Sequence, residues 1–162
     1  MQALFRQLSA GVYVVGAARN ERRDAFTAAW VMQVSFDPLL LALSIHPQHA
    51  SYALVMDSRA FTVNVLKQDQ LDVARRFGTR SGRESDKLAD VRWHPGRSGA
   101  PILDDALAYF DCEVTEHRTA GDHELLLGRV VDGRIIDPNA VPLTYQETGD
   151  MDGSTNLYPV RF

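Results

Sequence analysis

The feature of this sequence that most constrains its fold is a series of short apolar runs joined by turn residues. These runs are rich in β-branched and aromatic residues, which favour strands, and they lie at residues 12–15, 26–35, 39–45, 61–66, 106–115 and 124–131. The stretches 19–24 and 120–122 are typical of hairpin turns. Because turns, and not helices, join most neighbouring runs, the sequence predicts a mainly β, largely antiparallel sheet or small barrel.

Helical spacing of apolar residues predicts only three helices, at residues 2–9, 49–58 and 69–77. The third begins at Asp69, a good amino-terminal cap, and stops at Gly78. Residues 78–100 are expected to form a loop. We therefore expect two or three helices packed outside the sheet, a pattern that disfavours a doubly wound parallel fold.

The chain has 162 residues, of which 45% are hydrophobic, and it contains no repeat and no long Pro/Gly/Ser-rich linker. We expect a single domain over residues 1–162, because a chain of this length buries roughly 70% of the surface that it exposes when unfolded. The single cysteine, Cys112, excludes an intramolecular disulfide and cysteine-rich metal sites. Its alternating strand pattern favours a buried, inert thiol over a nucleophile.

A cytoplasmic protein without a membrane segment is expected. The cysteine usage fits a reducing compartment, the residues after Met1 do not form a signal peptide, and no run approaches about 18 consecutive apolar residues. The net charge of −4 argues against a nucleic-acid partner, which would require a basic surface. Residues 75–97 are nevertheless locally basic, and they form either a solvated loop or an electrostatic rim for a phosphate.

Several common site motifs are absent. No Gly-x-Gly-x-x-Gly follows a strand, and the sequence contains no P-loop, no Gly-x-Ser-x-Gly and no His-Glu-x-x-His. His46 and His49 are three residues apart without an acidic or thiol partner beside them, so we expect no metal site.

Three segments have the residue types of a binding site. The first combines the small residues Thr27, Ala28 and Ala29 with the flat Trp30, which suits a planar heteroaromatic ligand or, alternatively, a half-buried strand with a core tryptophan. In the second, residues 44–51 lead from a strand into a helix amino terminus. There the hydroxyl of Ser51 either helps to hold a phosphate or merely caps the helix.

The third segment is Gly121-Asp122-His123. The aspartate and glycine fit a turn, and the imidazole of His123 either belongs to that turn or projects into a cleft, where it can act near neutral pH.

Together and in this order, these segments resemble the flavin reductase-like family of FMN-binding split barrels. The resemblance covers roughly residues 8–133 and rests on Gly11–Val15, Phe26–Pro38, Phe61–Leu66, Ala74–Phe77, Ala120–His123 and Gly128–Val130. It implies a homodimeric, six-stranded antiparallel split barrel of Greek-key type that holds FMN, or alternatively FAD, with NADH or NADPH as electron donor.

The resemblance also assigns site residues. The flavin ring is expected along the strand Thr27 to Gln33, which includes Ala28, Ala29, Trp30 and Val31, with Ser35 beyond it. Beside the flavin and its phosphate we expect Ser44, Ile45, His46, Ala50 and Ser51, with Arg83 and Lys87 neutralising the phosphate. His123 is expected to face the nicotinamide as the catalytic residue.

Two departures from the family pattern are present. Ala28-Ala29-Trp30 stands where many relatives have several hydroxyl residues, so hydroxyl contacts to the flavin are left to Thr27 or to backbone N–H groups. This variant looks closer to the flavoredoxin-like branch. The acidic segment 149–156 does not match the family pattern either, and we interpret it as a mobile arm or a dimer strap.

The function that the resemblance implies is NAD(P)H-dependent flavin reduction, with reduced flavin passing to a monooxygenase partner. An FMN-holding electron carrier that accepts electrons from another protein is the alternative. A flavin-free binding module for another heteroaromatic compound is the third possibility, since Ala28 and Ala29 carry no hydroxyl groups.

Overall fold

A computed structural model describes residues 1–82 and 85–159 of the chain. Seven strands form one antiparallel sheet in the order β2-β1-β5-β8-β9-β4-β3. In chain order these strands are β1 (Tyr13–Arg19), β2 (Arg22–Ala28), β3 (Val31–Phe36), β4 (Leu39–Ile45), β5 (Ala60–Val65), β8 (Ala108–Ala120) and β9 (His123–Ile135).

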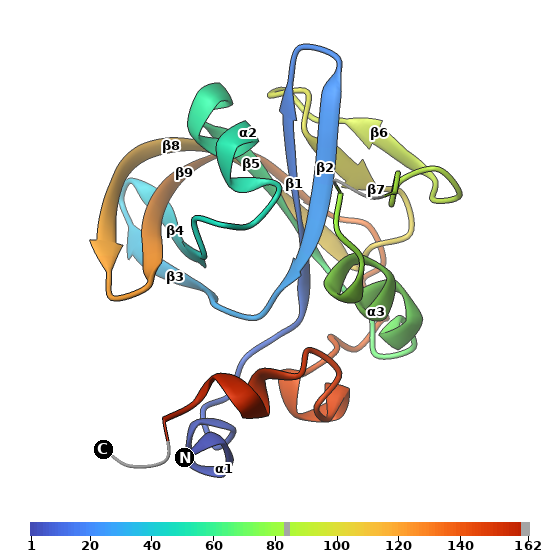
Figure 1. Cartoon of the computed structure of the whole chain (residues 1–162). Helices are drawn as coiled ribbons and strands as arrows, with labels where there is room; N and C mark the ends of the chain where they lie inside the picture. The colour runs from blue at the N-terminus through green and yellow to red at the C-terminus, as the bar shows by residue number, and fades with distance from the viewer. Residues whose placement is uncertain (83–84, 160–162) are drawn as a thin grey trace.

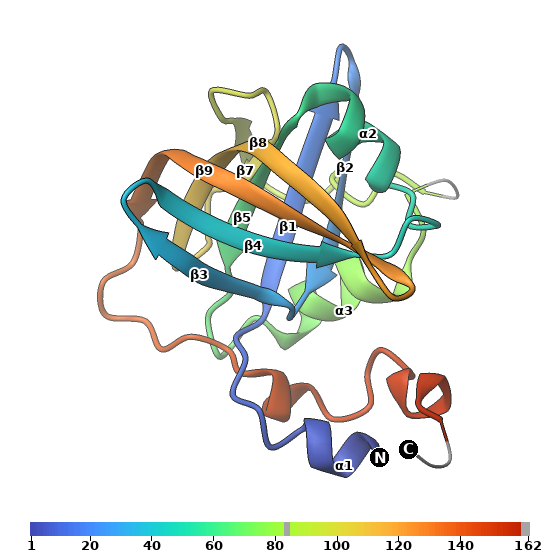
Figure 2. The same cartoon turned by 90° about the vertical axis from the view of Figure 1, so that its left-hand side faces the viewer.

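The sheet curls into an open barrel, with β8, β9, β4 and β3 lying across β5, β1 and β2 (Figures 1 and 2). The two edge strands, β2 and β3, are consecutive in the sequence and are joined by Ala29 and Trp30. The mainly β split-barrel prediction is therefore confirmed.

The number of strands differs from the six expected, because the run 26–35 is divided at Ala29 and Trp30. Its first part belongs to β2 and pairs with β1, while its second part belongs to β3 and pairs with β4. The first hairpin turn is also tighter than expected. It is centred on Asn20, whose φ of 55° is tolerated by asparagine, so that β2 already begins at Arg22.

The helices are short and lie outside the barrel. Two are shorter than predicted: α1 covers only Gln2–Phe5 and α2 only Tyr52–Ser58. The helix α3 (Leu71–Thr79) exists as predicted but lies two residues later, because Gln70 and not Asp69 is its amino-terminal cap and it continues through Gly78. The segment predicted as a loop contains β6 (Trp93–Pro95), which pairs with β7 (Pro101–Leu103). Strands of three residues are too short to show an alternating pattern.

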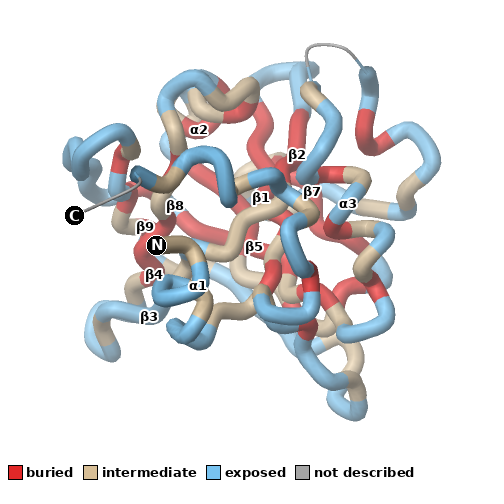
Figure 3. Tube along the Cα trace, turned by 60° about the horizontal axis from the view of Figure 1, so that its bottom comes forward, coloured by how far each residue is buried: buried red, intermediate tan, exposed pale blue. Residues whose placement is uncertain are grey.

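Two apolar clusters stabilise this arrangement. One fills the barrel and includes Phe61, Leu43 and Leu126, and the other lies between the sheet and α3 and includes Phe77 and Leu66. Much of the buried part of the chain lies on the strands (Figure 3). No helix among the described residues is both long and apolar enough to cross a membrane.

The amino-terminal segment and the described part of the carboxyl-terminal segment lie side by side beneath the barrel (Figures 1 and 2). The backbone N–H of Tyr145 donates to the carbonyl of Ala10 at 2.8 Å, and the N–H of Val12 donates to the carbonyl of Leu143 at 2.9 Å. Two short 3-10 helices follow, η1 (Tyr145–Thr148) and η2 (Ser154–Leu157). The acidic segment is thus folded against the amino-terminal segment.

Candidate functional site

Three aromatic side chains from distant parts of the sequence meet at one end of the barrel. Trp30 comes from the β2–β3 connection, His46 follows β4, and His123 begins β9. The His123 ring centroid lies 4.9 Å from that of Trp30 and 5.1 Å from that of His46, the latter pair edge to face. The antiparallel pairing of Ile45 with Glu124 produces this meeting, because it places the residues at the adjoining strand ends next to each other.

The cluster is open to solvent, and the imidazole of His123 is hydrogen-bonded to a neighbouring carboxylate. Trp30 is 55% exposed, an unusual state for a tryptophan in a small domain. Nδ1 of His123 lies 2.8 Å from Oδ1 of Asp122, and this hydrogen bond, followed by the nearby His123 charge, lowers the pKa of Asp122. The carboxylate therefore fixes the orientation of the His123 ring. The cluster offers a flat apolar surface beside a ring nitrogen, which suits a planar ligand with polar edges.

The half-buried residues Thr27, Ala28 and Ala29 lie at the end of the edge strand β2 and lead directly to Trp30. The hydroxyl of Thr27 donates to the carbonyl of Ala74 at 2.7 Å, so it can only accept a hydrogen bond from a ligand. Donors at this position must therefore come from the backbone N–H groups on the outer edge of β2, which no strand covers in the described part of the chain.

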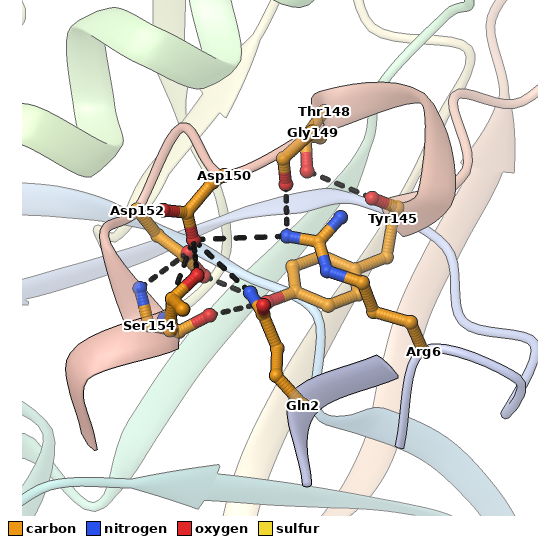
Figure 4. Close-up of polar contacts among 9 residues, drawn as sticks. Gln2, Arg6, Tyr145, Thr148, Gly149, Asp150, Asp152 and Ser154 are labelled. Atoms are coloured by element: carbon orange, nitrogen blue, oxygen red, sulfur yellow. Dashed lines mark hydrogen bonds and ion pairs between the residues drawn. The ribbon is translucent and has the colours of Figure 1, made fainter. Parts of the chain in front are cut away.

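A small cavity of about 80 Å³ adjoins this strand end, and part of its wall is the carboxyl-terminal segment. It is lined by Thr27, Ala28 and Ala29 on one side and by Tyr145, Thr148, Met151 and Asp152 on another. Figure 4 shows how the amino terminus holds this wall. Asp150 accepts a hydrogen bond from Gln2 at 3.0 Å and lies 3.9 Å from Arg6, and Arg6 also donates to the carbonyl of Gly149.

Other predicted residues of the β3 strand face a different cavity. Val31, Gln33 and Ser35 line an apolar cavity of about 310 Å³ at the mouth of the barrel, together with Tyr13 and Phe110. Burial raises the pKa of the Tyr13 hydroxyl. The structure thus divides the predicted ring-binding strand among three places. Thr27 to Ala29 line the small cavity, Trp30 belongs to the aromatic cluster, and the residues after it line the cavity at the barrel mouth.

The second predicted segment, residues 44–51, also contributes residues to more than one place. Ile45 is buried in the barrel core, whereas Ser44, His46 and Ala50 are half-buried, and the N–H of Ser44 donates to the carbonyl of Trp30 at 3.0 Å. Ser44 therefore lies beside the aromatic cluster, and His46 is part of it. The contribution expected of Ile45 cannot come from its side chain, because that side chain faces the core.

The residues expected to hold a phosphate point elsewhere. Ser51 and Lys87 are both buried, and both contact the carboxylate of Asp24. Arg83 lies outside the described residues. Asp24 was not identified from the sequence, because it stands in a polar run that is typical of an exposed turn. The wall residues Tyr145 to Asp152 were also missed, since nothing in their pattern indicates that they return to β2.

Two other kinds of site, a metal site and a cysteine nucleophile, were also considered. Among residues 1–82 and 85–159, no group of three or more His, Cys, Asp or Glu side chains is arranged to hold a metal ion. Cys112 is completely buried, and burial, followed by the charge of Asp111, raises its pKa to about 12.

A family model described as a flavin reductase like domain matches residues 5–154. Among curated proteins, diflavin flavoprotein A 1 of Synechocystis sp. is 31% identical over 130 residues, which are 80% of this chain and 23% of the relative. The chain spans about a quarter of the length of the first curated relatives that it matches.

Solved structures of similar fold can be superposed on nearly the whole chain. The NADH:FAD oxidoreductase SgcE6 of Streptomyces globisporus C-1027 has a TM-score of 0.84 and 25% identity, with coverage of 91% of this chain and 87% of that one. BorF, the flavin reductase component of a bacterial two-component tryptophan halogenase, has a TM-score of 0.82 and 30% identity, with coverage of 91% and 92%.

Proposed function

The chain belongs to the flavin reductase-like family, and from this premise we propose that it is an NAD(P)H-dependent flavin reductase that binds FMN. The observation that carries the proposal is the aromatic cluster of Trp30, His46 and His123 at the open end of β2. It joins a flat exposed surface, a fixed imidazole and uncovered backbone donors, which are the features that a planar isoalloxazine requires. The ring portion of a flavin therefore fits the residues present.

A bound flavin supplies the redox chemistry, accepting a hydride from the nicotinamide. The protein contributes binding, orientation and exclusion of water. In the proposed arrangement, the small side chains of Ala28 and Ala29 allow the ring to approach the backbone of β2, whose N–H groups donate to the ring edge. Trp30 covers the ring on one side, and His123, oriented by Asp122, faces the nicotinamide.

The same proposal includes the identity of the flavin, the electron donor, the oligomeric state and the partner. FMN is proposed because the residues of the proposed site would be used by the ring and the chain that adjoins it, and none is assigned to an adenosine. NADH and NADPH are both retained as donors. We further propose a single domain over residues 1–162, a homodimer, and transfer of reduced flavin to a monooxygenase partner. BorF, the flavin reductase component of a two-component halogenase, supports a partner enzyme for this chain, and the similarity to nitrilotriacetate monooxygenase component B of Mycobacterium thermoresistibile supports a monooxygenase.

The first experiment is an absorbance spectrum of the purified protein, alone and with added FMN, followed by anaerobic addition of NADH and then NADPH. Rapid bleaching of the flavin band by either nicotinamide is expected. Bound flavin that stays oxidised until a chemical reductant is added would instead identify an electron carrier. A protein that takes up neither FMN nor FAD would contradict both functions and favour a module for another heteroaromatic compound.

Replacing the proposed catalytic residue tests its role directly. In His123→Ala we expect hydride transfer to slow by about 10² to 10³-fold while the Kd for FMN changes by less than about fivefold, because the imidazole acts in orientation more than in binding. Stopped-flow absorbance and flavin fluorescence measure the two quantities. His94→Ala is a matched control, since His94 lies on β6 and its Nδ1 is likewise beside an aspartate, 2.7 Å from Oδ1 of Asp104. An unchanged rate in His123→Ala would remove His123 from the mechanism.

A further inference from the structure

A buried carboxylate occupies the place that the sequence assigns to a phosphate. Asp24, on β2, accepts a hydrogen bond from the hydroxyl of Ser51 at 2.6 Å, and its other oxygen lies 3.1 Å from Nζ of Lys87. The three residues are 7%, 0% and 2% exposed. We call Asp24, Ser51 and Lys87 the buried carboxylate cluster.

The cluster joins three separate segments of the fold. Asp24 comes from β2, Ser51 precedes α2, and Lys87 follows α3. The backbone also closes around the carboxylate, because a Cβ atom added at Gly82 would lie 2.4 Å from the carboxylate atoms of Asp24. The polar ends of Ser51 and Lys87 are therefore covered by protein, and a ligand cannot reach them unless the segments move.

Among the described residues, the charges of the cluster balance each other. One carboxylate faces one ammonium, so the amine of Lys87 has an anion beside it, although no described atom accepts a hydrogen bond from it. A flavin phosphate placed against Lys87 would bring a second anion next to Asp24 in a dry environment, where like charges repel strongly. The phosphate part of FMN therefore does not fit this cluster.

Resting on the proposed function, we propose that Asp24 is a specificity-determining residue that takes the place of the flavin phosphate at Ser51 and Lys87. The protein accordingly recognises its flavin by the ring and sugar chain, and it accepts riboflavin, a flavin without phosphate, nearly as well as FMN. The site is thus one for flavins as a class and not for flavin nucleotides alone.

The test compares the Kd values of riboflavin, FMN and FAD, measured by quenching of flavin fluorescence. In the unaltered protein we expect riboflavin and FMN to bind within about threefold of each other. In Asp24→Asn, which keeps an acceptor for Ser51 and removes the negative charge, we expect the preference for FMN over riboflavin to increase at least tenfold. Loss of the ion pair with Lys87 loosens the packing of the three segments, so that they can part and Lys87 can reach the phosphate. Asp104→Asn is the matched control, since Asp104 is also paired with a basic side chain but lies near the surface.

A double variant, Asp24→Asn with Lys87→Met, separates binding from folding. It removes both buried charges together, which proteins often tolerate, and the FMN preference gained by the single variant should disappear. A preference of tenfold or more for FMN in the unaltered protein, or no gain in Asp24→Asn, would overturn the inference. Failure of all three flavins to bind would contradict the proposed function itself, and the inference with it.

Discussion

At the scale of single residues, burial decides which polar groups can react. Cys112 is the only cysteine and is completely buried in β8. Desolvation, and secondarily the charge of Asp111, raise its pKa to about 12, so that at pH 8 only roughly one thiol in ten thousand is ionised. The thiolate is the reactive form, and the thiol should therefore be inert in the folded protein.

The prediction is that a colorimetric thiol reagent modifies Cys112 only after unfolding. The measurement is the number of titratable thiols in native buffer and in guanidinium chloride, with Cys112→Ser as the blank. Modification of the native protein within minutes would contradict the assigned burial. Such a result would also reopen the possibility that Cys112 is a nucleophile.

The buried carboxylate cluster shows the limit of sequence reasoning at this scale. The resemblance assigns Trp30, His46 and His123 to one flavin site, and in the structure their rings lie next to one another. It assigns Ser51 and Lys87 to the flavin phosphate, but nothing in the sequence points to Asp24 as their partner. The burial of Asp24 depends on packing between three segments, and no local pattern encodes that packing.

At the scale of elements, continuous apolar runs were predictable, whereas the division of a run and very short strands were not. The runs at 39–45 and 61–66 became β4 and β5 with shifts of at most one residue, since continuous apolar residues favour a buried strand. The division at Ala29 and Trp30 was missed because both halves have strand propensity, and only the pairing with different partners separates them. The place of the carboxyl-terminal segment was missed because its contacts are with the other end of the chain.

A hydrogen bond from Gln2 to Asp150 helps to hold the carboxyl-terminal segment that lines the small cavity (Figure 4). Asp150 accepts hydrogen bonds from Thr155 at 2.5 Å and Gln2 at 3.0 Å. The bond from Thr155, above all, lowers the pKa of Asp150 below its ordinary value of 3.8, with smaller contributions from Gln2 and Arg6. Because the pKa of Asp150 is lower in the folded state, its carboxylate contributes to the stability of this segment. The contribution is present above pH 3.8 and is lost as the pH falls through the folded-state pKa.

In Asp150→Ala we therefore expect the segment after Gly149 to be cleaved several times faster at neutral pH, with little change in the melting temperature of the barrel. The side chain is exposed and contributes mainly to local order. Limited proteolysis with mass spectrometry measures the cleavage, and Asp57→Ala on α2 is the control. Unchanged cleavage would show that Met151 and the other wall contacts suffice to hold the segment.

At the scale of the whole molecule, the site lies where the sheet opens. β2 and β3 are the two edges of the sheet, and the residues between them reach the aromatic cluster. A closed barrel would cover the backbone of β2, whereas the split leaves it accessible to a ligand. The same opening leaves apolar side chains exposed along β3 and the turn after it, among them Met32 and Phe36, which are 64% and 87% exposed.

Exposed apolar side chains that gather along a sheet edge are typical of interaction surfaces. We predict that a second copy of the chain covers this edge, forming the proposed homodimer, and that Phe36→Glu shifts the population toward monomer. Burial of one phenylalanine contributes about 1.5–3 kcal/mol, so the dimer should weaken by at least about tenfold. Light scattering coupled to size exclusion across a concentration series measures this change.

Leu157→Glu is the matched control, since Leu157 is 82% exposed but lies on the carboxyl-terminal segment, away from β3. If only the Leu157 variant dissociates, the interface lies on the chain ends instead. A monomeric unaltered protein at all concentrations would contradict the homodimer. Because the exposed Trp30 directly precedes β3, dissociation by Phe36→Glu should also weaken FMN binding, which connects assembly of the molecule to its site.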